Sequence, residues 1–99
     1  MFNNPRYLTR GVDEKISQFL QMLMWDMIDE MQIEKDYLQV FNLIPAELNG
    51  EKVLKIVHSQ EKPPYQRTIM LSNLTPPIQE KLFVIDDGDH STMMLADEY

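Results

Sequence analysis

Two tight turns limit how the middle of this chain can pair with itself. Asn49-Gly50 favours a two-residue hairpin, because both central positions of a type I′ turn need positive φ. Lys62-Pro63-Pro64 marks a second turn. When the residues flanking each turn are paired, such as Leu48 with Glu51, both registers place the same apolar set on one sheet face: Phe41, Leu43, Leu54, Ile56, Ile69 and Leu71. A slip of one residue would scatter this set, so the sequence predicts an antiparallel meander with one apolar face.

Alternation of apolar and polar residues gives the expected limits of the meander strands. Pro45 is expected to loosen the first ladder or lengthen the loop, because proline has no backbone N–H to donate. The three strands are predicted at Tyr37–Ile44, Val53–Ser59 and Tyr65–Ser72.

Further strands are predicted on either side of the meander. Tyr7–Arg10 is expected to be a short edge strand. A final hairpin around Asp87-Gly88 is expected to join Leu82–Asp86 to Ser91–Leu95. Thr75-Pro76-Pro77 is predicted to form a loop, and the last four residues are expected to be solvated.

A helical period precedes the meander. The segment Ile16–Ile33 carries one apolar stripe on a helix that we expect to start after the N-cap Asp13, at about Glu14, and to end near Lys35. The stripe comprises Ile16, Phe19, Leu20, Leu23, Met24, Met27 and Met31. The predicted fold class is therefore α+β: one long amphipathic helix packed on a mostly antiparallel β-sheet of about five or six strands, in a single domain spanning 1–99.

Trp25 lies nearly opposite the middle of that stripe, among polar side chains. A large aromatic residue there indicates a second buried surface. We take Trp25, Met22 and Ile28 as hydrophobic anchors of a candidate binding site, with Asp26 and Asp29 as its acidic rim. Three occupants remain open: another part of the same chain such as the N-terminal arm, a second copy in a homodimer, or a separate protein partner.

The charge distribution excludes several classes of partner. The net charge is −7, and the acids gather in Asp26–Asp36 and Asp86–Tyr99. Such acidity opposes direct binding to nucleic acid and to anionic membranes. It leaves open an acidic modulator or inhibitor of a nucleic-acid-binding protein. The chain has no cysteine, and no signal or membrane-spanning segment is evident, so a cytoplasmic location is expected.

Two clusters offer possible chemistry. The acids and histidine of Asp86–His90 could hold a hard cation, although a tight hairpin turn explains their composition better. His58, Arg67 and Tyr65 form a second cluster, which we expect to be a half-exposed cross-strand pair at the sheet rim rather than a general base. With only three glycines, a phosphate-binding loop is excluded. We assign no catalytic residue, metal ligand, cofactor or small-molecule substrate.

Four segments resemble a small family from Gram-positive bacteria, domain of unknown function 960: YLTRGV, DYLQVF, QEKPPY and LFVIDDGDHSTMMLADEY. The resemblance runs from Arg6 to Tyr99, and its most specific part is VIDDG followed by HSTM and the acidic end with its tyrosine. It implies a single bacterial domain and no activity, cofactor or partner.

Three functional hypotheses follow from these residues. The first is a non-enzymatic protein-binding or adaptor domain that uses the helix face around Trp25. The second is an acidic modulator of a nucleic-acid-binding protein. The third is a small enzyme or metal-binding protein at the Asp86–His90 turn.

Overall fold

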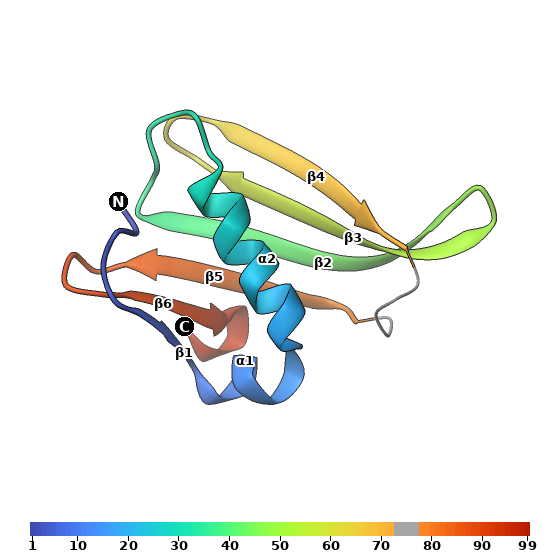
Figure 1. Ribbon diagram of the computed structural model, residues 1–99, viewed down its shortest axis with the longest axis horizontal. Coiled ribbons are helices and arrows are strands. Elements are labelled where there is room, and N and C mark those ends of the chain that lie inside the picture. The colour runs from blue at the N-terminus through green and yellow to red at the C-terminus, as the bar shows by residue number, and fades with distance from the viewer. Residues whose placement is uncertain (73–77) are drawn as a thin grey trace.

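The computed structural model describes residues 1–72 and 78–99, so the predicted loop at Thr75-Pro76-Pro77 lies outside the described residues. The described residues form β1 (Arg6–Leu8), α1 (Arg10–Lys15), α2 (Gln18–Asp29), β2 (Leu38–Leu48), β3 (Glu51–Gln60), β4 (Tyr65–Leu71), β5 (Glu80–Asp86), β6 (Ser91–Leu95) and the 3₁₀ helix η1 (Ala96–Glu98). One six-stranded sheet has the order β1-β6-β5-β2-β3-β4, and α2 crosses it (Figure 1). The parallel pair is β1 with β6, and the other neighbours are antiparallel. The α+β prediction is confirmed.

Both predicted turn registers are confirmed. Leu48 faces Glu51 across the first turn, and Gln60 faces Tyr65 across the second. Asn49 and Gly50 have φ of 53° and 80°, as a type I′ turn requires. The predicted apolar set shares one face of the sheet: Phe41, Leu43, Leu54 and Ile56 are buried, and Ile69 and Leu71 are half-buried against them.

The expected weakening at Pro45 is wrong. β2 continues through Pro45 to Leu48, and Pro45 faces Leu54 in an unbroken ladder. Because the pair that flanks a two-residue turn exchanges hydrogen bonds, alternate pairs along the ladder do not, and Pro45 falls in one of the latter. Its nitrogen points away from β3. On that side the pairing with β5 has already ended at Leu43, so no hydrogen bond is lost.

The single long helix from about Glu14 to about Lys35 is also wrong. Two helices replace it, because Ile16 is extended, with φ −110° and ψ 123°, and Ser17 caps α2 by accepting from Leu20 N–H at 3.3 Å. The N-cap of α1 is Thr9 rather than Asp13. α2 has 12 residues and ends at Asp29.

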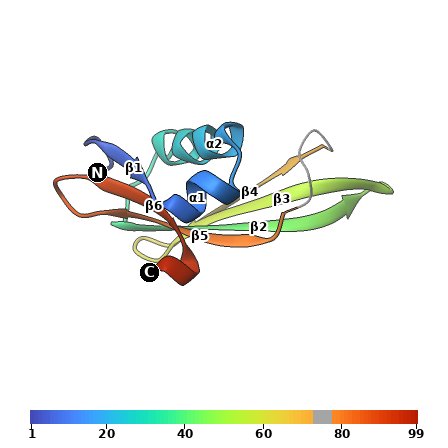
Figure 2. The same cartoon turned by 90° about the horizontal axis from the view of Figure 1, so that it is seen from below.

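α1 and α2 lie on one side of the sheet, whereas η1 lies on the other side (Figure 2). The core between helices and sheet takes most of the predicted stripe: Ile16, Leu20, Met24, Met27 and Met31 are buried, and Leu23 is half-buried. Phe19 does not belong to it, being 60% exposed. The buried arc of α2 is rotated away from Phe19 and towards Ile28, which is buried in the core.

The C-terminal residues Asp97, Glu98 and Tyr99 are exposed, as expected for a solvated end, and they are also tied to the fold by hydrogen bonds. The Glu98 carboxylate accepts from the Thr9 hydroxyl at 2.6 Å, Leu95 N–H at 2.8 Å and Gly11 N–H at 3.1 Å. These bonds, the one from Thr9 most strongly, lower the pKa of the Glu98 carboxyl below its usual value. No helix among the described residues is long and apolar enough to cross a membrane.

Candidate functional site

The outward side of α2 presents two large apolar side chains. Phe19 and Met22 are each 60% exposed and lie one turn apart near the start of the helix. Asp26, one turn further on, is exposed as well. Residues three and four apart share a helix face, so these three side chains form one surface, called the α2 surface below. Sequence reasoning missed Phe19. The signal that could have found it is angular, because Phe19 lies at the very edge of the predicted stripe at 100° per residue.

Trp25 is half-buried at the edge of this surface. Its ring packs against the hydrophobic core, and the Arg6 guanidinium lies 4.7 Å from the ring centroid. Arg6 also forms an ion pair with Asp29 and donates to the Phe2 carbonyl. Of the three occupants left open by the sequence, the N-terminal arm of the same chain is therefore the one that contacts Trp25 here.

Ile28 was predicted as an anchor beside Trp25, and the structure corrects this. Ile28 has 0% exposure and belongs to the core. The reason is the rotation of α2 already described, which turns Ile28 towards the sheet. Met22 and Asp26 stay on the α2 surface, and Asp29 is exposed beside it in its pair with Arg6.

The charges of α2 oppose its own dipole. The helix has no acid in its first turn and no base in its last turn. Asp26, Asp29 and the C-cap Glu30 instead put negative charge at the end where carbonyl groups are already exposed, which costs stability. Arg6 compensates Asp29, and Arg67 lies 3.7 Å from Glu30. Asp26 has no ion pair within the described part of the chain, so its charge faces solvent on the α2 surface.

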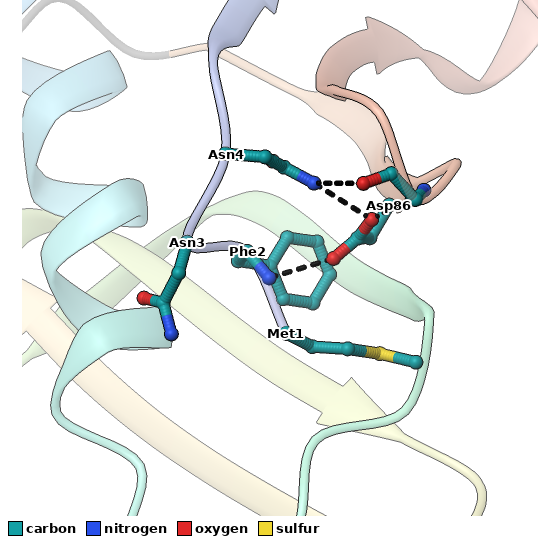
Figure 3. Close-up of a pocket in the computed structure, with 6 residues that line it drawn as sticks. Met1, Phe2, Asn3, Asn4 and Asp86 are labelled. Atoms are coloured by element: carbon teal, nitrogen blue, oxygen red, sulfur yellow. Dashed lines mark hydrogen bonds between the residues drawn. The ribbon is translucent and has the colours of Figure 1, made fainter.

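At the β5–β6 turn, the Asp86 carboxylate is bound within the fold. Asp86 accepts from Phe2 N–H at 2.7 Å and from the Asn4 amide at 3.0 Å (Figure 3). It also accepts from Gly88 N–H at 2.7 Å. These bonds, that from Phe2 foremost, lower the pKa of the Asp86 carboxyl. His90 lies 3.4 Å from Asp87. Within residues 1–72 and 78–99, no three His, Cys, Asp or Glu side chains are arranged to hold a metal ion.

A shallow cleft of about 350 Å³ borders this turn, lined by Met1, Phe2, Asn3, Asn4, Asp86 and Gly88 (Figure 3). Phe2 is buried beside it with a φ of 65°. Asn4 and Asp86 bind each other and the neighbouring backbone. The cleft therefore lies where the N-terminal segment packs against the β5–β6 turn.

A relay of side-chain hydrogen bonds fixes the tautomer of His58. The Gln60 amide donates to the carbonyls of Glu34 and Pro63, each at 2.9 Å, so its oxygen accepts from the Gln39 amide at 2.7 Å. The Gln39 oxygen then accepts from His58 Nε2 at 2.7 Å. His58 therefore carries its proton on Nε2, and its buried Nδ1 has no hydrogen-bond partner among the described residues.

His58 is not the half-exposed rim residue that the sequence predicted. It is fully buried, stacked on Phe41 with ring centroids 4.3 Å apart, and meets Tyr65 edge-on at 5.4 Å. Arg67 faces it in the register, as predicted. Burial, with a smaller effect of the Arg67 charge, lowers the pKa of His58 to about 4. The segment after α2 covers this end of the sheet through the Gln60 bonds, which makes His58 a core residue.

These features define a small α+β domain whose sheet has its two α-helices on one face. The family model described as "Staphylococcal protein of unknown function (DUF960)" matches residues 5–98. The chain belongs to this family, which confirms the resemblance of its four motifs.

One solved structure extends the comparison. The crystal structure of a protein of unknown function from Enterococcus faecalis is similar to this chain, with a TM-score of 0.77 and 27% sequence identity. The match covers 98% of this chain and 92% of that one. No curated protein matches the chain.

Proposed function

We propose that this protein is a non-enzymatic protein-binding domain whose α2 surface contacts a partner through Phe19, Met22 and Asp26. The observation that carries the proposal is the exposure of Phe19 and Met22, 60% each, side by side on a helix with a well-filled core on its other side. Large apolar side chains grouped at the surface mark interaction sites, and methionine adapts to varied partners.

The charges beside this pair favour a basic partner. Asp26 keeps a negative charge, without an ion pair in the described part of the chain, near the C-terminal end of α2, where it costs stability. An aspartate that lowers the stability of the fold can be retained because it contributes to binding. We therefore infer that the partner offers an apolar contact for Phe19 and Met22 and a lysine or arginine for Asp26.

The two groups that could act as a general acid or base, His58 and Asp86, are engaged in the fold, which favours a binding role over a catalytic one. His58 is buried in the core with a lowered pKa, and Asp86 holds the N-terminal segment against the β5–β6 turn. Both groups are committed to folding interactions, so we propose no reaction for them.

Affinity capture from the native cytoplasm tests the proposal, with bound proteins read by mass spectrometry. Three baits are compared: wild type, Met22→Glu and Leu48→Glu. Leu48 is 47% exposed at the β2–β3 hairpin, so its variant makes the same kind of change far along the chain from α2. A protein held by wild type and Leu48→Glu but lost with Met22→Glu supports the proposal. Equal recovery with all three baits contradicts it.

Two further measurements separate the alternative occupants of the α2 surface. Sedimentation velocity of wild type and Met22→Glu asks whether the surface forms a homodimer, which the variant would dissociate. For a captured partner, titration with salt distinguishes the acidic-modulator hypothesis. Binding dominated by charge weakens steeply with ionic strength, whereas binding anchored by Phe19 and Met22 weakens little.

A further inference from the structure

Strand β4 lies at the outer border of the sheet, with β3 on one side and no described strand on the other (Figure 1). Leu48 and Glu51 flank a two-residue turn and exchange hydrogen bonds, so the odd-numbered residues of β3 bond to β2 and the even-numbered ones bond to β4. Their partners on β4 have odd numbers, such as Arg67 opposite His58. The even-numbered residues of β4 therefore direct their N–H and C=O groups away from the sheet.

These even-numbered residues, Gln66, Thr68 and Met70, form a free edge. All three are exposed, and their outward N–H and C=O groups have no backbone partner within residues 1–72 and 78–99. An N–H and a C=O repeated at every second residue match the groups of another extended strand. The chemistry of the edge therefore calls for an extended backbone as its occupant.

Two other free edges of the sheet are protected against such pairing. β1 has only three residues and carries the charge of Arg6. β2 continues after its pairing with β5 ends at Leu43, and there Pro45 has no N–H to offer on the free side. Short strands, charges and proline are common means by which edge strands avoid pairing. β4 has seven residues, an unbroken register and neither proline nor lysine.

We propose that β4 pairs with β4 of a second copy of this chain, antiparallel and centred on Thr68. In this register Thr68 lies opposite Thr68 of the second copy, and Gln66 lies opposite Met70. Each outward N–H then meets an outward C=O, so the free edges of both β4 strands are used completely. The two copies are related by a two-fold axis, and the protected β1 edges are left at the two ends of the joint sheet.

The charges near the edge allow this pairing. Arg67 is the only charged residue of β4, and it lies opposite Ile69 of the second copy rather than opposite its own equivalent. Glu30 of its own chain lies 3.7 Å from it. Among the β3 residues that face β4, the charged one is Lys55, beside Met70, so both β4 strands separate it from its equivalent. No pair of like charges is brought face to face.

Side chains also favour this register over its neighbour. Tyr65 lies opposite Leu71 of the second copy, and aromatic–aliphatic pairs across strands stabilise a sheet. Pairing centred on Arg67 would instead set two guanidinium groups opposite each other. It would also bring Pro64, which has no N–H to donate, into the ladder. The register centred on Thr68 avoids both costs.

The pairing has a consequence for the α2 surface. Because the two-fold axis is perpendicular to the sheet, the α2 helices of both copies lie on the same side. The dimer would present two α2 surfaces in a fixed arrangement, which strengthens binding to a partner with two matching sites. The pairing itself does not involve the α2 surface, so it does not depend on the proposed function.

Sedimentation velocity at protein concentrations from about 1 μM to about 1 mM tests the pairing, because weak to moderate complexes dissociate in this range. Wild type should change from monomer to dimer within it. Thr68→Lys should weaken the dimer by about tenfold or more, because two lysines meet at the axis. Gln66→Lys is the matched control. It adds the same charge to the same strand opposite Met70, and should change the dissociation constant by less than about threefold.

A mixture of charged variants tests the position of the axis. Thr68→Glu alone should weaken the dimer as Thr68→Lys does, whereas an equal mixture of the two should form a heterodimer, because opposite charges then meet. Circular dichroism checks that each variant is folded. In wild type, amide hydrogen exchange at Gln66, Thr68 and Met70 should slow as the protein concentration rises, which requires no substitution.

Four results would overturn the inference. The first is a wild type that stays monomeric up to about 1 mM. The second is equal weakening of the dimer by Thr68→Lys and Gln66→Lys, and the third is a mixture of folded Thr68 variants that forms no heterodimer. The fourth is a dimer that Met22→Glu dissociates, which would place the second copy on the α2 surface instead.

Discussion

Arg6 connects two parts of the molecule that lie far apart in sequence, the N-terminal segment and α2. Its guanidinium lies over the Trp25 ring, pairs with Asp29 and donates to the Phe2 carbonyl. A cation over tryptophan gains more when both groups are partly desolvated, as here. Trp25 is thus held inside the monomer, whereas Met22, three residues earlier, has no such cover.

Substitutions at these two positions are expected to separate folding from binding. Trp25→Glu should lower the free energy of unfolding by about 2 kcal/mol or more, because it removes core packing and the contact with Arg6. Met22→Glu should change it by less than about 0.5 kcal/mol, because the side chain is exposed. Urea denaturation of both variants measures the difference. Equal stability of the two variants would place Trp25 outside the core.

The buried His58 makes the fold sensitive to mild acid. Its pKa is about 4 in the folded protein and near 6.5 when the chain is unfolded. Between these values the unfolded chain binds the proton and the folded chain does not, so stability is full above pH 6.5 and falls as the pH drops towards 4. The expected loss over this window is about 3 kcal/mol.

Denaturation at several pH values between 7 and 4 checks this prediction. His58→Gln is the control, because a glutamine can still donate to Gln39 but does not titrate. The slope of stability against pH should be smaller in the variant. An unchanged slope would assign the acid sensitivity to other groups. Asp86 and Glu98 act in a lower window, since their pKa values are lowered and their contributions are lost only as they are protonated.

At the scale of elements, α2 has a stabilising N-terminus and a destabilising C-terminus. Ser17 supplies an N-cap, but the last turn carries acids without a base. The short loop at Ile16 and Ser17 lets α1 and α2 take different directions over the sheet (Figure 1). The helix is therefore stabilised chiefly by its packing face, including Leu20 and Met24, rather than by its own charges.

Reversing one charge on α2 is expected to improve stability at the expense of binding. Asp26→Lys should raise the free energy of unfolding by about 0.3–1 kcal/mol, because a cation near a helix C-terminus interacts favourably with the exposed carbonyls. The same variant should lose a partner captured through the α2 surface. Thermal unfolding and the capture experiment measure the two effects. A destabilised variant would show that Asp26 has a structural role.

At the scale of the whole molecule, the arrangement of helices over the sheet determines where the core lies. Helices α1 and α2 cover one face of the sheet, and η1 lies on the other side (Figure 2). A domain of 99 residues buries a modest core, and here that core lies between the sheet and the two α-helices.

The molecule is not expected to gain stability from divalent metal ions. The Asp86 carboxylate is already satisfied by Phe2, Asn4 and Gly88. Calcium, magnesium and zinc at micromolar concentrations should each leave the melting temperature unchanged, as scanning calorimetry can show. A ligand that binds only the folded state must stabilise it, by about 2.7 kcal/mol at a hundredfold excess over its Kd. A clear rise with one metal would reveal a site.

The sequence by itself determined the meander, its registers and its apolar face. The turns at Asn49-Gly50 and Lys62-Pro63-Pro64 are local, and a hairpin turn sets the pairing of every residue that follows it. The facing of His58 and Arg67 was predictable for that reason. The burial of His58 was not, because it depends on the segment after α2 folding back over the end of the sheet.

Tertiary structure alone decided the candidate site. Periodicity gives a stripe on a helix but not the angle at which the helix meets the sheet, and a modest rotation of α2 exchanged Phe19 for Ile28 in the core. Trp25 was visible in the sequence as an unusual residue, yet its cover, Arg6, lies 19 positions earlier and reaches it because β1 lies beside β6 at the sheet edge. Contacts between distant segments depend on how the layers pack, which no local pattern encodes.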